Sequence, residues 1–174
     1  MRKQKGFSLI ELLIVVAIIL IIAAIAIPNL MRARMAANDS SAAASERSIV
    51  TGEISYFSSY PTIGFTSLAA LGGPIGAACV PSPTTACFID SQLANNGAPA
   101  NTGKSGYSFA VTLSTGSGSA VPNQFYATAI PLSNTTGSKS FCAEDDGVLR
   151  QQPAGTTTVT TSYAACEALN PLAN

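Results

Sequence analysis

Near its N-terminus the chain reads Phe7-Ser8-Leu9-Ile10-Glu11-Leu12-Leu13-Ile14-Val15-Val16-Ala17-Ile18-Ile19-Leu20-Ile21-Ile22-Ala23-Ala24-Ile25-Ala26-Ile27, and Pro28 follows. As a helix, with about 1.5 Å rise per residue, this run is roughly 31 Å long, enough to cross the hydrocarbon core of a bilayer. Its only charged side chain is the carboxylate of Glu11. We therefore expect a membrane-spanning helix that contains one acidic group.

A short basic leader precedes this run. Arg2, Lys3 and Lys5 lie before Gly6, and the run itself contains no basic residue. Basic residues flanking a membrane span remain on the cytoplasmic side, so the N-terminus is expected in the cytoplasm and everything after Pro28 outside it. The bulk of the protein is thus predicted to be extracytoplasmic.

The carboxylate of Glu11 is costly in a membrane unless it has a partner. At the centre of a spanning helix an acid costs about 2.5 to 3.5 kcal/mol on insertion scales, and less towards an end. Cleavage between Gly6 and Phe7 would create a positively charged α-amino group four residues before Glu11, and would place the acid in the first helical turn, where the macrodipole favours negative charge. In an assembly of such helices the amine of one subunit could pair with Glu11 of another and set the register between subunits.

In these residues the chain resembles the type IV pilin and type II secretion pseudopilin superfamily. The matching stretch runs from Lys5 to Ile19 and continues from Ile25 to Asn29. Beyond roughly the first 30 residues the resemblance is only architectural.

The resemblance implies a specific maturation. A prepilin peptidase in the inner membrane is expected to cleave after Gly6 and to methylate the amine of Phe7, and the mature subunits are expected to polymerise into a helical filament. The resemblance also implies that Glu11 contacts the N-terminus of a neighbouring subunit. Pro28 is expected to be a weak point of the helix, in agreement with the missing N–H of proline.

Two other interpretations of the apolar run remain open. A secretory signal peptide also has a basic start and an apolar core, and Ala24-Ile25-Ala26 offers a small-x-small cleavage site. Its apolar region is normally about 7 to 15 residues long, however, whereas this one has about 20 and contains a carboxylate. A plain single-pass anchor leaves Glu11 without a role.

The whole chain predicts an α+β fold, in which a long N-terminal helix packs on an antiparallel β-sheet of about four strands. We expect a leader at 1–6, a membrane and filament-core helix at 7–28, and an amphipathic continuation at 29–60. The helix should end at Ser59, because Tyr60 precedes a proline. Its buried stripe is expected to contain Ile49, Val50, Ile54 and Phe57, and its polar face Arg47, Ser48 and Glu53.

Residues 61–174 are expected to form an extracytoplasmic globular head. The part at 61–106 has no sustained period and predicts a long loop with one or two helical turns, which in pilins forms part of the exposed filament surface. The part at 107–174 predicts the sheet and a C-terminal disulfide loop, with strands at 107–113, 123–132, 139–143 and 148–151. The acidic turn Glu144-Asp145-Asp146-Gly147 is a hairpin signal and a weaker candidate for a cation site, because it lacks the ligand spacing of an EF-hand.

The four cysteines all lie on the side expected outside the cytoplasm, where disulfides form. Of the three possible pairings, the most economical joins Cys79 with Cys87 and Cys142 with Cys166. The resemblance favours this pairing, because a disulfide-closed C-terminal segment is common in type IV pilins. A zinc site would need C-x2-4-C pairs, which the sequence lacks.

The sequence does not indicate an enzyme. It has no histidine, no paired carboxylate spacing and no Gly-x-Ser-x-Gly motif, so we expect no catalytic residue, no cofactor and no metal site. Without the leader the chain carries six basic and nine acidic residues, a net charge of −3, which does not indicate a general nucleic-acid-binding surface.

Within the superfamily two functions compete. A type IV pilin builds a surface fibre for adhesion, twitching motility or DNA uptake, whereas a pseudopilin builds a short periplasmic filament for protein secretion. Mature length, four cysteines and a Ser/Thr-rich head favour the pilin. A membrane-tethered binding module that never polymerises is a third possibility. The expected partners are the chain itself as a helical homopolymer, prepilin peptidase, an inner-membrane assembly platform, the lipid bilayer before assembly, and a surface ligand of unknown nature.

Overall fold

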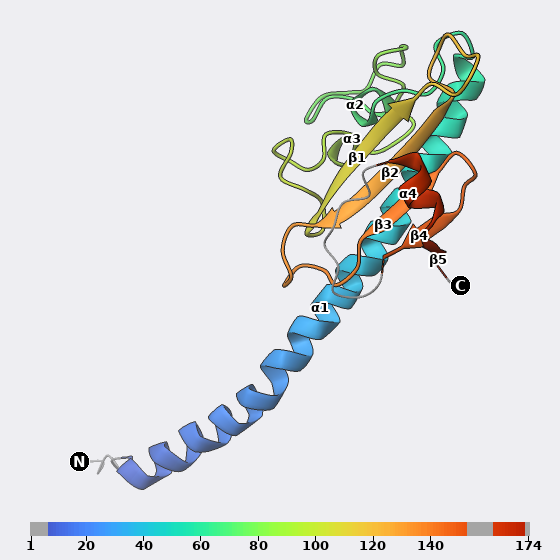
Figure 1. Cartoon of the computed structure of the whole chain (residues 1–174). Helices are drawn as coiled ribbons and strands as arrows, with labels where there is room; N and C mark the ends of the chain where they lie inside the picture. The colour runs from blue at the N-terminus through green and yellow to red at the C-terminus, as the bar shows by residue number, and fades with distance from the viewer. Residues whose placement is uncertain (1–6, 153–161, 173–174) are drawn as a thin grey trace. The chain divides into compact units, whose positions relative to one another are not determined.

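The computed structural model describes residues 7–152 and 162–172, so the expected leader at 1–6 lies outside the described residues. The chain divides into two compact units, Met1–Arg34 and Met35–Asn174. One long helix, α1 (Leu9–Ser59), supplies residues to both units (Figure 1). It ends immediately before Tyr60, as the sequence predicted.

The second unit contains the sheet. Its strands β1 (Tyr107–Ser114), β2 (Gln124–Pro131), β3 (Phe141–Glu144), β4 (Leu149–Gln151) and β5 (Asn170–Pro171) follow one another in sheet order, and all neighbours are antiparallel. The α+β prediction is confirmed. The structure adds to the four expected strands the two-residue strand β5, which is too short to show a period in the sequence.

Three short helices complete the second unit: α2 (Leu68–Leu71), α3 (Ser91–Ala94) and α4 (Tyr163–Glu167). The first two are the helical turns expected between the long helix and the sheet. The hairpin between β3 and β4 turns at Gly147, whose φ of 75° lies in the left-handed region that glycine adopts without steric cost.

The hydrophobic core of the second unit lies between α1 and one face of the sheet (Figure 1). Alternate strand residues face this core, as the period of two requires. Phe109 on β1, Ala129 on β2 and Phe141 on β3 are paired across the sheet, and all three are buried. Ala127 and Ala143 form a second such pair on the same strands.

The buried face of α1 differs from the expected one. Ile49 and Val50 are buried as predicted, but Ile54 is 46% exposed and Phe57 is 36% exposed. Glu53, expected on the polar face, is fully buried. The helix presents its polar groups to the core because some of them find partners there: the Glu53 carboxylate accepts a hydrogen bond from the Thr66 N–H at 3.0 Å.

Glu46 is a second fully buried carboxylate on α1, and neither of its oxygens has a hydrogen-bond partner among the described residues. Burial raises the pKa of Glu46 well above its ordinary value. Burial also raises the pKa of Glu53, to about 8, although the hydrogen bond from Thr66 lowers it in part. Both groups thus favour the protonated form near neutral pH, because an unpaired buried charge is costly.

We expect the free energy of unfolding of the chain in detergent to fall as the pH rises from about 4.5 to about 8. A buried carboxyl whose pKa is raised holds its proton more tightly in the folded chain than in the unfolded one, so stability is greatest below the unfolded pKa and is lost above it. One pKa unit corresponds to about 1.4 kcal/mol, so the fall should reach several kcal/mol. Denaturant unfolding across this range measures it.

The variant Glu46→Met should reduce this pH dependence, to which Glu53 still contributes, and stabilise the chain at pH 8 by about 1 to 4 kcal/mol, since an apolar side chain of similar length replaces a buried carboxyl group whose oxygens have no partner among the described residues. Glu167→Gln, at an exposed position, is the matched control; because Glu167 adds only a minor repulsion to the burial that raises the pKa of Glu144, this variant should change the slope much less than Glu46→Met does. A stability that rises with pH over this window would contradict the assignment of these groups.

Candidate functional site

The first unit contains an apolar helix whose large side chains are exposed in the part of the chain that the structure describes. Every large apolar side chain from Phe7 to Met31 is exposed, with Phe7 at 77% and Leu9 at 79%. The best window of this helix has a mean hydropathy of 3.3, and none of it is buried, so the helix is long and apolar enough to cross a membrane. Pro28 lies inside the helix, within the first unit.

A shallow groove runs along this helix. It is lined by Leu9, Leu12, Leu13, Val16, Ala17 and Leu20. Counted from Leu9, these positions are i, i+3, i+4, i+7, i+8 and i+11, so they lie on one face of the helix. Such rows of side chains are the surfaces by which helices pack ridge into groove.

Glu11 lies at the start of this apolar face, in the first turn of α1. Its Oε2 accepts a hydrogen bond from the backbone N–H of Ser8 at 2.9 Å. Ser8 immediately precedes the helix and Glu11 is the third helical residue, so this bond is one half of a capping box. The pattern Ser-x-x-Glu ahead of an apolar run is the signal by which the sequence could have revealed it.

Arg32 and Arg34 follow the apolar segment. Both are exposed, and neither forms an ion pair within the described parts of the chain. They are therefore free to bind anionic groups outside the chain.

The second unit fastens its part of α1 to the sheet through Asn38 and Asp39. The Asn38 Nδ2 donates to the Thr136 carbonyl at 2.7 Å. Asp39 accepts from the hydroxyl of Tyr107 at 2.6 Å and from both the N–H and the hydroxyl of Ser138, at 3.1 and 2.7 Å. No local sequence pattern indicates this cluster, because its members lie about 70 and 100 residues apart in the chain.

Gly137 makes this cluster possible. A Cβ at this position would overlap the ring and the hydroxyl of Tyr107. The loop between β2 and β3 can therefore approach Tyr107 closely enough for its hydroxyl to lie within 2.8 Å of the Lys139 carbonyl oxygen as well. Burial and the neighbouring Asp39 carboxylate raise the pKa of Tyr107, which keeps its hydroxyl protonated as a donor.

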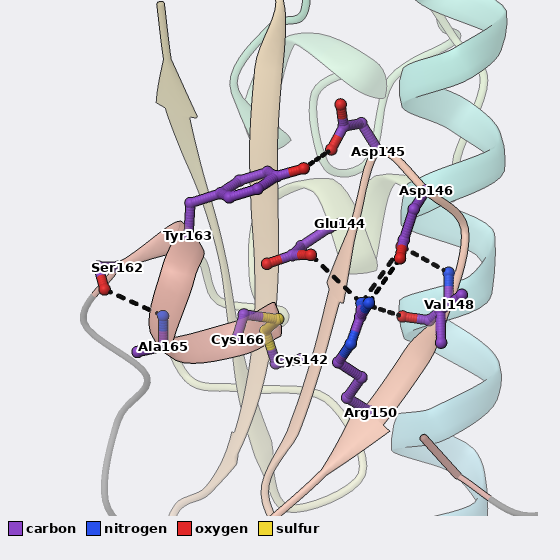
Figure 2. Close-up of a disulfide and its surroundings, with 10 residues drawn as sticks. All are labelled: Cys142, Glu144, Asp145, Asp146, Val148, Arg150, Ser162, Tyr163, Ala165 and Cys166. Atoms are coloured by element: carbon purple, nitrogen blue, oxygen red, sulfur yellow. Dashed lines mark hydrogen bonds and ion pairs between the residues drawn. A yellow bond between two sulfur atoms is a disulfide. The ribbon is translucent and has the colours of Figure 1, made fainter. Parts of the chain in front are cut away.

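The acidic turn after β3 is held by Arg150 on β4 (Figure 2). One guanidinium nitrogen of Arg150 lies 2.6 Å from Asp146 and the other 3.3 Å from the buried Glu144. Burial raises the pKa of Glu144 to about 6 even though Arg150 opposes the shift. Burial alone would also raise the pKa of Asp146, but hydrogen bonds from Arg150 and Val148 lower it below its ordinary value.

This turn does not resemble a cation site. The guanidinium occupies the space between the two carboxylates, and no group of three or more potential metal ligands occurs within residues 7–152 and 162–172. The third acid, Asp145, accepts a hydrogen bond from the hydroxyl of Tyr163 at 2.6 Å (Figure 2).

Two disulfides join Cys79 to Cys87 and Cys142 to Cys166, with Cα atoms 6.0 Å apart in each pair. The second fixes α4 beside β3, next to the acidic turn (Figure 2). The first closes a small loop that α1 holds through the hydroxyl of Tyr56, which donates to the Pro83 carbonyl at 2.7 Å.

Comparisons with known proteins match parts of the chain. Residues 1–27 match the family described as the prokaryotic N-terminal methylation motif. The type IV wide pilus major component PilA4 of Thermus thermophilus is 69% identical over 39 residues, which are 22% of this chain and 30% of that protein. The type IV major pilin protein PilA of Myxococcus xanthus is 46% identical over 56 residues, 32% of this chain and 26% of that protein.

The chain thus carries a type IV prepilin motif at its N-terminus and is similar over part of its length to type IV pilins. The matched segments span less than a third of either relative. No solved structure matches the chain. The family match lies at residues 1–27, and each relative matches less than a third of this chain, so most of the second unit is known from its own geometry.

We expect the two disulfides to contribute unequally to stability. In the chain-entropy description a longer closed loop stabilises more, and the two bonds span separations of 24 and 8 residues. Replacing Cys142 and Cys166 together by alanine should cost about 3 to 4 kcal/mol of unfolding free energy, and replacing Cys79 and Cys87 about 2 to 3 kcal/mol. Denaturant unfolding of the two double variants measures the difference, and equal or reversed losses would contradict it.

Proposed function

We propose that this chain is the structural subunit of a type IV pilus. The observation that carries the proposal is the exposed apolar groove from Leu9 to Leu20, which begins beside Glu11 and lies in the segment that matches the methylation motif. A helix of this kind is stable only where something covers it, and copies of the same helix have the matching row of side chains. The role is structural rather than catalytic.

Maturation follows from the same segment. Prepilin peptidase cleaves after Gly6, removes the leader 1–6, and methylates the amine of Phe7. Until assembly the helix spans the inner membrane with its N-terminus in the cytoplasm, and Arg32 and Arg34 meet lipid head groups on the other side. The described start of the helix supports this, because Phe7 precedes α1 and is exposed.

In the filament, the helix leaves the bilayer and packs against copies of itself. The amine of Phe7 in one subunit pairs with Glu11 of another, so that neither charge is buried alone. An inner-membrane assembly platform drives this exchange, and Pro28 is the point at which the helix yields. The second unit forms the outer surface, where its disulfide-closed loops are available for adhesion, twitching motility or DNA uptake.

The variant Glu11→Ala should abolish surface filaments while the subunit remains in the membrane, because assembly would bury the Phe7 amine without a partner. The matched control is Glu167→Ala, which removes an exposed carboxylate from the second unit. Electron microscopy of sheared surface material measures filament yield, and mass spectrometry of the subunit determines its N-terminus.

A loss of at least tenfold in filament yield for Glu11→Ala, with normal yield for Glu167→Ala, is the expected result. Filaments at normal yield in Glu11→Ala would contradict the proposed role of Glu11 in setting the register between subunits. A mature N-terminus at any residue other than Phe7 would contradict the assigned cleavage site.

A further inference from the structure

We propose that the backbone N–H of Ser8 is a positioning group: it holds one oxygen of Glu11 within the subunit and leaves the other oxygen for the amine of a neighbouring copy. This inference rests on the proposed function, since it concerns how Glu11 is presented before assembly. It assigns to the Ser8 peptide group a role that the pairing of Glu11 with a neighbour does not itself require.

The Ser8 peptide is tied to the first turn of the helix in both directions. Its N–H donates to Glu11 Oε2 at 2.9 Å, and its carbonyl accepts from the N–H groups of Glu11 and Leu12 at 3.1 and 3.3 Å. The carboxylate is therefore fixed to the backbone that directly follows Phe7. A change in the side-chain torsions of Glu11 would break the bond.

The other carboxylate oxygen is open. Within the described residues Glu11 Oε1 has no hydrogen-bond donor, and Ile10 and Leu12 on either side of Glu11 are exposed. An ionised carboxylate has about four acceptor positions, so a second donor can bind Oε1 while Ser8 remains on Oε2. The bond within the subunit and the contact between subunits are compatible, and one does not have to break before the other forms.

This arrangement lowers the free energy of the unassembled subunit and the free-energy cost of assembly. Before assembly, the bond satisfies one of the N–H groups at the start of the helix, which has no other partner in an apolar medium. During assembly, the glutamate side chain has already lost rotamer freedom, so the contact with a neighbour does not have to offset that loss again. A neighbour then binds a carboxylate that is already oriented.

Amide exchange of Ser8 tests the bond directly. The probe is the unassembled chain in detergent, in wild type, Glu11→Gln and Glu11→Ala, with the exchange rate of the Ser8 N–H measured by NMR. Glutamine keeps an acceptor oxygen without the charge, whereas alanine has no acceptor. We expect the Ser8 amide to exchange roughly tenfold more slowly in wild type and Glu11→Gln than in Glu11→Ala. Equal rates in all three chains would overturn the proposal.

A second pair of variants tests what the bond does. Ser8→Pro deletes the N–H, while the matched control Ser8→Ala removes only the hydroxyl and keeps the N–H. Among subunits that mass spectrometry shows to be cleaved and methylated, Ser8→Pro should assemble at least tenfold less well than Ser8→Ala. Equal yields from the two variants would show that the N–H has no positioning role.

The outcomes separate this inference from the function on which it rests. If Glu11→Gln keeps the slow Ser8 exchange and loses filaments, both proposals stand. If it keeps the slow exchange and still forms filaments, the charge pairing of Glu11 fails while the hydrogen bond from Ser8 stands. If Ser8 exchange is the same with and without Glu11, the bond is absent whatever happens to the filaments.

Discussion

The apolar side chains from Phe7 to Met31 are exposed in a single chain. Contact between so much apolar surface and water is unfavourable. Burial of apolar area is worth roughly 25 cal/mol for each Å², so this helix gains far more from a cover than any single polar contact in the molecule supplies. A bilayer offers one cover and copies of the same helix offer another. In the proposed function the helix exchanges the first for the second, which requires that the two be of similar apolarity.

Polar groups at the start of this helix have to be compatible both with the bilayer and with packing against copies of the helix. A carboxylate is expensive in either medium unless donors are aimed at it, and the structure provides one donor from Ser8 within the chain. The second donor of the proposed account, the amine of Phe7 in another copy, exists only after cleavage and assembly. In the proposed account, Glu11 therefore has the Ser8 donor in the unassembled subunit and gains the second donor in the polymer.

In the second unit, polar contacts and a disulfide hold the C-terminal part of α1 and the elements around it against the sheet. Asp39 fastens the helix through Tyr107 and Ser138, and the disulfide from Cys142 to Cys166 fixes α4 beside β3. Glu46 lowers the stability near neutral pH, since it is buried without a hydrogen-bond partner among the described residues. Such a group favours folding in mild acid, where it is protonated.

The sequence could predict the elements that depend on local patterns. The apolar run, the proline after Tyr60, the alternation from Tyr107 and the Asp-Gly turn each depend on a few adjacent residues, and the structure has a helix, a helix end, a strand and a hairpin there. The predicted buried face of α1 was wrong at Ile54, Phe57 and Glu53. Which side chains of the helix are buried depends on contacts with the following loop, such as the hydrogen bond from Thr66 to Glu53.

The candidate site likewise contains residues that a local motif indicates and residues that only long-range contacts bring together. The methylation motif could be predicted because it is one continuous stretch, and residues 1–27 match the family described by that motif. Cleavage after Gly6 and the role of Glu11 stay predictions. The cluster around Asp39 could not be predicted, because Tyr107 and Ser138 come to it from distant parts of the chain and Gly137 matters only through the space it leaves. Long-range contacts of this kind have no period or spacing in the sequence.

The most direct test of the account is a high-resolution cryo-electron microscopy map of the material that the mature chain forms on the cell surface. The account predicts a helical polymer in which the faces from Leu9 to Leu20 of different copies are buried against one another, with the Phe7 nitrogen of one copy within about 4 Å of the Glu11 carboxylate of another. A polymer held together by the second units alone, with these faces still exposed or Glu11 distant from every amine, would contradict it.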